Sequence, residues 1–303
     1  MTKIGHIKSM VLIIFKERVN SARMKIFNPD IIKAAIIKEL SHIAYQIDDY
    51  ILQVLIRAID SEESEIARDI LLSLVENIKI AGENIFPLCQ DTGLVVFWVR
   101  IGNNFPLYNI NLNKIINEAV TEAFFENKYR LSVVNDPILR QNTKTNTPAI
   151  IHYDFVEGDN LEIDIMLKGG GAENMSALKM LSPSAGIDGI RSFVIETVKN
   201  SGGNACPPLI VGVGVGGNFE TVALLAKKSL FRKPSEKNSS TFWGQEEEYL
   251  LNAINKLGIG PMGLGGTTTA LKVNILAKPC HIASLPVAVN LECHAHRVGQ
   301  VIL

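Results

Sequence analysis

Apolar residues recur at helical spacing through the first third of the chain. The pattern predicts three helices, at residues 31–47, 48–59 and 62–80. Asn28 precedes Pro29 at the start of the first helix, a capping residue followed by proline in the first turn. The third helix begins after Ser61 with acidic residues, which the helix dipole favours there. We expect these helices to pack and to carry no chemistry.

The pattern changes to β-branched and aromatic runs after residue 93. These runs predict strands at residues 94–101, 207–217, 269–277 and 283–292. Two further strands, 149–156 and 161–167, flank Glu157–Asn160 and predict a β-hairpin. Helical spacing returns at residues 112–129, 174–181, 189–202, 218–230 and 246–258, with a polar loop predicted at 231–245.

The hairpin implies antiparallel sheet, which argues against a simple parallel α/β repeat. The sequence therefore predicts an α+β fold, in which an N-terminal helical region packs on a mixed, substantially antiparallel β-sheet with interspersed helices. We find no internal repeat and no linker that divides the chain.

Composition narrows the class of partner. The 303 residues include 47% hydrophobic residues, enough for a sizeable core. Thirty basic residues against 31 acidic ones, without long runs of either sign, argue against nucleic acid or anionic membrane as a partner. No apolar segment reaches the roughly 18 residues that a membrane-spanning helix needs. Small molecules and other proteins are the expected partners.

Residues 1–23 are basic, with a short apolar core at Met10–Phe15. Secretory signals usually have an apolar core of roughly 7–15 residues, so this segment falls short. An organelle presequence stays open, but we prefer a dispensable extension ahead of a second possible start at Met24. One domain is then expected to span residues 24–303, in the cytoplasm.

Four cysteines are the main chemical signal: Cys89, Cys206, Cys280 and Cys293. Their wide spacing, without a convincing export signal, favours thiols or metal ligands over a disulfide framework. Cys89, Cys206 and Cys293 each lie at a predicted strand edge or turn, and a cysteine beside proline, as at Cys206, suits iron–sulfur ligation. Taken singly, each position is better explained by a buried cysteine. Spacing therefore supports only a weak metal hypothesis.

Two arrangements of the cysteines stay open. Four ligands would close the site, as in structural zinc or an electron-transfer cluster. Three would leave one iron of a cubane without a protein ligand, so that it can act as a Lewis acid. A zinc site built from Cys293, His294 and His296 is disfavoured, because alternate residues of a strand point to opposite faces.

Two glycine runs have competing interpretations. Gly212, Gly214 and Gly217 form G-x-G-x-x-G between a predicted strand and a helix. A dinucleotide site needs a second strand ending in an acid about 20 residues on, which would fall in the polar loop. We interpret these glycines as close strand–helix packing beside a site, with a nicotinamide-dependent oxidoreductase as the alternative. Gly169–Gly171 predicts either an anion-binding nest or a plain turn.

Taken together, the motifs resemble the α subunit of the two-subunit class I fumarate hydratases and L(+)-tartrate dehydratases. The resemblance runs from about Met24 to the C-terminus. The matching segments are PLCQDTG (87–93), YRLSVVNDP (129–137), NTPAIIH (146–152), KGGGAENMSALKML (168–181), NACPPLIVGVGVGGNFETVALLAKKSL (204–230), LGIGPMGLGGTTTALKVNILA (257–277) and HIASLPVAVNLECHAHR (281–297).

The resemblance implies a cofactor and its ligands. Three cysteines of that family hold an oxygen-sensitive 4Fe-4S cluster whose fourth iron binds substrate. By motif these are Cys89, Cys206 and Cys293, and Cys280 is expected to be a bystander.

The resemblance also implies a set of substrate-binding residues. Gln90 and Asp91 are expected to face the substrate, and Arg130 to bind one of its carboxylates in bidentate fashion. Gly170 and Gly171 would let the backbone approach where a side chain would clash. Asp91 is the candidate catalytic residue, orienting substrate or relaying a proton without being the sole base.

The family divides its active site between two polypeptides. Only Val298–Leu303 follow Arg297 here, so a separate β subunit is expected to supply further arginines, a lysine and a threonine, in a heterotetramer of two α and two β subunits. The expected reaction is reversible hydration of fumarate to L-malate, or dehydration of L(+)-tartrate to oxaloacetate. A non-catalytic zinc or electron-transfer iron–sulfur module is the alternative of another class.

Overall fold

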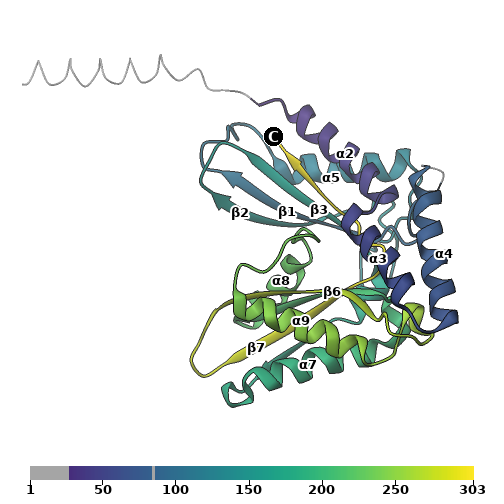
Figure 1. The fold of residues 1–303 in the computed structure, drawn as a ribbon. Helices are drawn as coiled ribbons and strands as arrows, with labels where there is room; N and C mark the ends of the chain where they lie inside the picture. The colour runs from purple at the N-terminus through teal and green to yellow at the C-terminus, as the bar shows by residue number, and fades with distance from the viewer. Residues whose placement is uncertain (1–26, 84–85) are drawn as a thin grey trace, which may run out of the picture.

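Two four-stranded mixed sheets organise the chain (Figure 1). The computed structural model describes residues 27–83 and 86–303, so the predicted extension at 1–23 lies outside the described residues. The first sheet has the order β2–β1–β3–β8, with β1 (Leu94–Gly102), β2 (Ile150–Val156), β3 (Leu161–Lys168) and β8 (Val298–Ile302). The second has the order β4–β7–β5–β6, with β4 (Ala177–Leu181), β5 (Leu209–Gly217), β6 (Ala270–Cys280) and β7 (Leu285–Glu292).

Each sheet combines one parallel pair with two antiparallel pairs. The parallel pairs are β1 with β2 and β5 with β6; the other pairings are antiparallel. Helices accompany both sheets, which confirms the predicted α+β fold with mixed, substantially antiparallel sheet.

Each sheet has its own set of covering helices. The helices are α2 (Pro29–Tyr45), α3 (Asp49–Ser61), α4 (Glu65–Gly82), α5 (Leu112–Glu126), α6 (Gly170–Asn174), α7 (Gly186–Ser201), α8 (Phe219–Ser229) and α9 (Thr241–Asn255). The first core joins α2 and α5 to β1 and β3. The second joins α3, α4, α7 and α9 to β5, β6 and β7. Helix α8 lies between the two sheets (Figure 1), where Lys228 forms an ion pair with Asp154 of β2 at 2.5 Å. None of the helices within residues 27–83 and 86–303 combines the length and the hydropathy that a membrane-spanning segment needs.

The predicted hairpin is wrong in its pairing. Strands β2 and β3 both exist, but β1 lies between them. Phe97 of β1 pairs with Ile151 in parallel and with Ile165 in antiparallel register. The segment around Glu157 therefore crosses over an intervening strand. Chain proximity favours a tight turn, but β1 offers both strands a buried, β-branched neighbour.

Three further boundaries differ from the sequence-based expectation. Residues 174–181, predicted as a helix, contain β4, which pairs with β7. Helix α9 starts at Thr241, inside the predicted polar loop, where the Ser240 hydroxyl accepts a hydrogen bond from Trp243 N at 3.4 Å. Helix α4 is capped by Ser64, and Ser61 instead ends α3. Strand β8 was not predicted.

The glycines of β5 serve close packing, as the sequence analysis interpreted them. A Cβ placed on Gly212 would lie 2.7 Å from Ser229 Oγ, and one on Gly214 would lie 2.7 Å from Ala226 N, both on α8. They do not line the cleft described below. Strand β5 pairs with antiparallel β7 on one side, so the sheet is not the doubly wound parallel type of a dinucleotide-binding domain.

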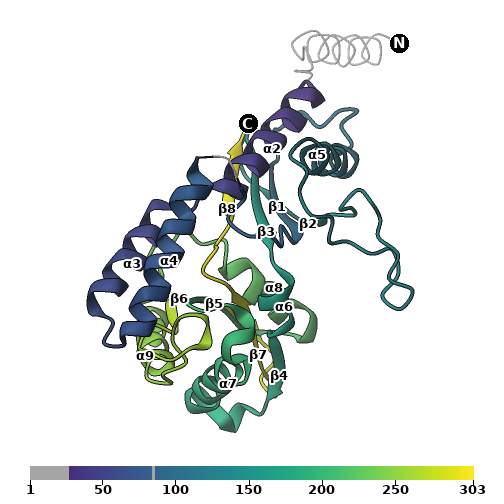
Figure 2. The same ribbon diagram turned by 90° about the vertical axis from the view of Figure 1, so that its right-hand side faces the viewer.

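The chain crosses between the two sheets at neighbouring points. It leaves β3 of the first sheet, forms α6 and enters β4 of the second. It returns from β7 through residues 293–297 into β8. Figure 2 shows α6 directly below β3, between the sheets. Both crossings carry motif residues, so the candidate site lies where the sheets meet.

Candidate active site

The Cys89 loop joins α4 to β1 and is held on both sides. Leu88, which is buried, donates from its N–H to Ala44 O at 2.9 Å. Its carbonyl accepts a hydrogen bond from the Asn77 amide at 3.0 Å. Cys89 is half-buried and Gln90 exposed. Residues on α2 and α4 therefore fix where the loop presents its thiol.

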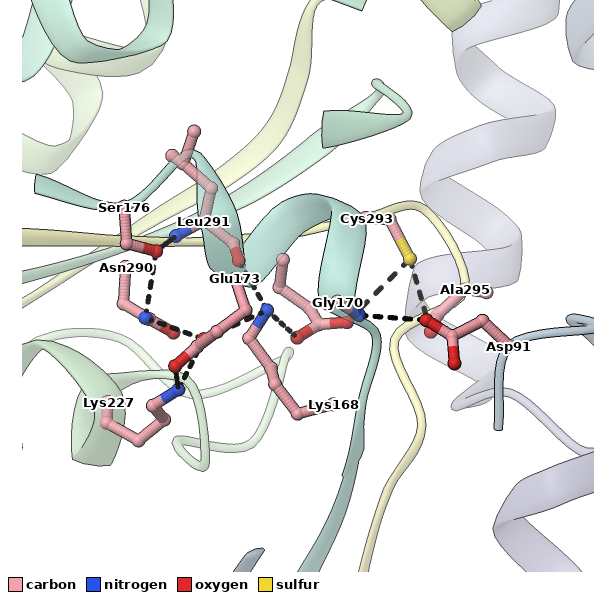
Figure 3. A network of polar contacts seen from close by, with 11 residues as sticks. Asp91, Lys168, Gly170, Glu173, Ser176, Lys227, Asn290, Leu291, Cys293 and Ala295 are labelled. Carbon is pink, nitrogen blue, oxygen red and sulfur yellow. Dashed lines mark hydrogen bonds and ion pairs between the residues drawn. The ribbon is translucent and has the colours of Figure 1, made fainter. Parts of the chain in front are cut away.

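Asp91 is immobilised by three hydrogen bonds. Its Oδ2 accepts from Gly170 N at 2.8 Å, and its Oδ1 accepts from Gly93 N at 3.0 Å and from the Ser132 hydroxyl at 3.1 Å. Figure 3 shows Asp91 against Gly170. The glycine turn thus binds an anion, but that anion is the chain's own carboxylate. Gly93 needs its flexibility, with φ at +75° and a Cβ position 2.5 Å from Lys168 C.

Cys206 follows α7 through a short 3₁₀ turn and has a left-handed backbone, with φ at 55°. A side chain other than glycine adopts this conformation only where its surroundings hold it there. The holding contacts come from His294, whose N–H and ring Nδ1 lie 3.4 and 3.1 Å from Cys206 O. Because a carbonyl only accepts, His294 carries its ring hydrogen on Nδ1. This pair ties the Cys206 turn to the loop of Cys293.

Cys293 follows β7 and is buried. Its sulfur lies 3.7 Å from Glu292 Oε1 and 3.8 Å from Ala295 O. Burial raises the pKa of this thiol to about 12, with the Glu292 charge adding to the rise and Arg297 opposing it. The thiol is therefore neutral at physiological pH unless a metal takes the place of its proton.

The three loops meet at the turn Gly169–Gly171. Asp91, two residues after Cys89, bonds Gly170. The carbonyl of Asn204, two residues before Cys206, lies 3.2 Å from a Cβ position on Gly171. Nη2 of Arg297, four residues after Cys293, lies 3.7 Å from a Cβ position on Gly169. Folding thus gathers three segments that are far apart in sequence.

The thiols themselves influence one another. Burial raises the pKa of Cys206 and the nearby Cys89 adds to the rise. Cys89 also contributes, after burial and Glu292, to the raised pKa of Cys293. The pKa values of both thiols therefore respond to charge on Cys89.

Cys280 does not join this group. It is exposed at the end of β6, where it pairs with Gly217, the last residue of β5. Cys206 precedes the first residue of β5. Nine residues of strand separate the two ends, roughly 30 Å at the usual rise. A closed centre with all four cysteines is incompatible with this topology.

A single-ion site finds no support in the residues that the structure describes. They contain no group of three or more His, Cys, Asp and Glu side chains placed to hold one metal ion. Residues 293–297 form a bend and not the strand assumed from sequence, and His294 faces Cys206 O. A cluster differs from a single ion in that each thiolate binds a different iron.

An open cleft of about 760 Å³ adjoins the glycine turn. Its lining residues are Asp91, Gly93, Leu94, Arg130, Leu131, Ser132, Val133, Val134, Arg140, Asn142, Gly170 and Asn174. Three predicted substrate residues, Asp91, Arg130 and Gly170, are therefore in one cleft. Gln90 and Gly171 are exposed but do not line it. Two arginines beside an already hydrogen-bonded carboxylate suit a small anion.

A network of buried and half-buried charges supports the turn from behind (Figure 3). Lys168, 1% exposed, donates to Leu291 O at 2.7 Å and pairs with Glu292 at 3.1 Å and Glu173 at 3.4 Å. Glu173 also pairs with Lys227 at 2.5 Å. Burial opposes the charge of Glu173, but the two lysines outweigh it and lower its pKa. The network fixes α6 against β7. Sequence reasoning missed it, although a lysine ending the apolar strand 161–168 was a usable signal.

Arg297 was also missed, although it belongs to the ECHAHR motif. It is fully buried, and none of its three guanidinium nitrogens has a hydrogen-bond partner within residues 27–83 and 86–303. An unpaired buried cation is costly, so these surroundings suit an anionic group. Three free thiols on the loops that meet at the same glycine turn supply the donor set that iron–sulfur clusters use. The residues present therefore fit such a cluster.

Comparisons with known proteins each match most of this chain. The family described as Fumarate hydratase (Fumerase) matches residues 33–302. The Methanocaldococcus jannaschii protein named "Putative L(+)-tartrate dehydratase subunit alpha" is 46% identical over 246 residues, 79% of this chain and 86% of that protein. The L(+)-tartrate dehydratase subunit alpha of Escherichia coli O157:H7 is 32% identical over 264 residues, 86% of this chain and 87% of that protein. The family match contains all three gathered cysteines and the cleft.

Proposed function

Because the chain belongs to the fumarate hydratase (Fumerase) family, we propose that it is the α subunit of an iron–sulfur hydro-lyase that reversibly hydrates fumarate to L-malate. That activity would link it to the tricarboxylic acid cycle. The proposal assigns this role to residues 24–303. The observation that carries it is the meeting of the Cys89, Cys206 and Cys293 loops at Gly169–Gly171, beside a cleft with Arg130.

A specific observation favours a second substrate. The relatives reported above are named tartrate dehydratase subunits, whereas the family carries the name of fumarate hydratase. Both reactions add or remove water at a four-carbon dicarboxylate, and the described cleft supplies binding groups for either. Dehydration of L(+)-tartrate to oxaloacetate is therefore the alternative within the same chemistry.

Cys89, Cys206 and Cys293 would hold the 4Fe-4S cofactor. When bound, the cluster supplies a Lewis acid that polarises the substrate hydroxyl. The geometry of the loops supports this assignment, because His294, next to Cys293, contacts the carbonyl of Cys206 through its N–H and its ring Nδ1.

The chain's own residues would position the diacid. Arg130 and Arg140 line the cleft and are available to hold a carboxylate and the negative charge that develops when the α-proton leaves. The fixed carboxylate of Asp91 orients the substrate, and the Ser132 hydroxyl that donates to it offers a short proton path to the cleft. Gly170 leaves room for the substrate, while its N–H is already bonded to Asp91.

We also propose that a β subunit completes this site. The reported relatives are named as α subunits, which supports a second polypeptide. An assembly of two α and two β subunits is part of the same proposal. Four free thiols favour a reducing compartment such as the cytoplasm.

The test is anaerobic co-expression with the candidate β subunit, followed by assays on fumarate, L-malate, L(+)-tartrate and mesaconate. Iron and sulfide analysis and electron paramagnetic resonance accompany the assays. We expect an iron–sulfur signal that changes on adding fumarate, and the highest kcat/KM with fumarate or malate. Preference for tartrate would select the alternative substrate. Zinc, or a stable cluster that no substrate perturbs, would instead support a non-catalytic module and overturn the proposal.

A further inference from the structure

Arg297 is the feature that the proposed reaction does not explain. Its side chain is 0% exposed, yet Nε, Nη1 and Nη2 lack hydrogen-bond partners within residues 27–83 and 86–303. Its backbone carbonyl accepts from Leu167 N at 3.0 Å, which holds it to β3 at the start of β8. Retaining a full positive charge in such a place is expensive unless an anion faces it.

The neighbouring buried cation shows the contrast. Lys168 is also buried, but it pairs with Glu292 at 3.1 Å and donates to Leu291 O at 2.7 Å. Among the described residues, Lys168 therefore has carboxylate partners and the guanidinium of Arg297 has none. In the part of the chain that the structure describes, the lack of a protein partner is thus specific to Arg297, because the equally buried Lys168 has partners.

The Asp91 carboxylate, which approaches the same glycine as Arg297, already has hydrogen-bond partners. Asp91 Oδ2 and Arg297 Nη2 each lie 3.7 Å from the same Cβ position on Gly169. The oxygens of Asp91 accept bonds from Gly170, Gly93 and Ser132, and no ion pair joins Asp91 to Arg297 among the described residues.

Arg297 also lies outside the cleft that we assign to the substrate. Arg130 and Arg140 line the cleft, whereas the buried Arg297 does not. The charge of Arg297 instead acts to lower the pKa values of Cys293 and His294, which lie on the loop after β7. Its position therefore suits the thiolate-bound group and not a substrate carboxylate.

We propose that Arg297 provides the counter-charge of the iron–sulfur cluster, so that its cost in the cluster-free protein becomes stabilisation once the cluster is bound. The inference rests on the proposed function, because it requires that cofactor. The charge of surrounding groups tunes both the retention and the potential of such clusters. Arg297 is a positioning residue in this role and does not touch substrate.

The test compares Arg297→Met, Arg297→Lys and wild type in the complex with the β subunit, each with its cluster and after chelation of iron. Removing an unpaired charge should raise the apparent Tm of the cluster-free Arg297→Met complex by about 3 °C, and lower that of the loaded complex by a similar amount. Anaerobic transfer of iron to a chelator should be at least about tenfold faster in Arg297→Met than in wild type. Arg297→Lys, which keeps the charge, should stay near wild type in both states.

Lys168→Met is the matched control, because its partners are within the protein. It should destabilise the loaded and the cluster-free complex alike. If Arg297→Met lowers the Tm of both states, or releases iron at the wild-type rate, the inference is wrong although the cofactor stands. If wild type holds no iron–sulfur cluster at all, the proposed cofactor fails first, and the inference fails with it.

Discussion

The four cysteines illustrate how location decides the chemistry of one residue type. Cys293 is buried beside Glu292 and Arg297, whereas Cys280 is exposed at the far end of the same sheet and bonds Ser284 O at 3.4 Å. A thiol in the first setting is shielded from solvent and reaches its charged form only with a cation or metal. A thiol in the second has no such requirement. The two therefore form a natural test pair.

We expect Cys293→Ser to abolish hydratase activity and to lower bound iron sharply, because serine is a poor ligand for iron–sulfur clusters. Cys280→Ser should retain nearly all activity and iron. Both are measured as iron per complex and kcat/KM after anaerobic purification. Equal losses in the two variants would contradict the assignment of three ligands.

The position of Arg130 in the cleft leads to a prediction for substrate affinity. It is exposed and lines the cleft, and its backbone carbonyl accepts from the Thr92 hydroxyl at 2.8 Å. Arg130→Met should raise KM by about 10–100-fold, the loss expected for hydrogen bonds to a charged group. Arg130→Lys should recover only part, because an ammonium lacks the bidentate fork. Lys144→Met, on the same segment but outside the cleft, should change KM little. Unchanged KM in Arg130→Met would remove it from the substrate site.

Sequence motifs identified the residues that touch the cleft better than those that support it. Resemblance placed Asp91, Arg130 and Gly170 in one site, where the structure has them lining one cleft. The spacing of the residues did not predict that the Asp91 carboxylate would accept a hydrogen bond from the glycine turn. Lys168 and Arg297 were missed because a charged residue in sequence is read as exposed, and burial of a charge depends on tertiary partners.

Glu62 shows how a single carboxylate joins elements that are distant in sequence. It lies between α3 and α4, 1% exposed, and accepts hydrogen bonds from Thr267 N, Thr268 N and the Thr268 hydroxyl at 2.9 to 3.0 Å. Burial opposes its charge, but the bonds from Thr267, Thr268 and Ser64 outweigh that effect and lower its pKa. The helical pair is thereby attached to the glycine loop before β6.

Glu62→Gln should reduce the free energy of unfolding at neutral pH by roughly 1–3 kcal/mol, because an amide group opposes some of these donors. A carboxyl whose folded pKa is lowered contributes its stability above the unfolded pKa of 4.5 and loses it as the pH falls through the folded value. The deficit should therefore be full above about pH 5 and shrink below about pH 4. Urea unfolding of the full chain across this range measures it. Glu63→Gln, exposed next door, should show no deficit; a pH-independent difference would contradict the charge-based account.

Element types were easier to predict than pairings. Long amphipathic runs gave α2, α3, α5 and α7 close to their observed bounds, because a repeat of 3.6 residues sustained over several turns matches a helix and hardly any other structure. The pairing of β2 and β3 with an intervening β1 depends on contacts between residues far apart in sequence. Short segments failed for another reason: Ala177–Leu181 fits a helical or a strand pattern, and only its pairing with β7 decides.

At the scale of the whole molecule, the candidate site lies where the chain passes from one sheet to the other. The turn after β3 and the loop after β7 are both crossings, and the Cys89 loop enters β1 beside them. Each sheet has its own apolar core, and the core of the second sheet also includes Val96 and Met166 of the first. The site lies between these two packed layers and opens outward through the cleft. A site built in this way holds one face of a ligand. The opposite face is available to another polypeptide.

This geometry predicts that the isolated chain and the complex differ in activity but not in cluster content. Reconstituted anaerobically, the chain alone should bind iron and sulfide in amounts close to those of the complex, since all three proposed ligands belong to it. Its turnover should stay below about 1% of the complex, because the proposal assigns to the β subunit groups that complete the site, and positioning of such groups is worth at least about a hundredfold. Titration with the β subunit should restore activity up to a stoichiometric end point. Full turnover by the chain alone, unchanged by the partner, would show that Arg130, Arg140 and Asp91 suffice and that the site is complete within these residues.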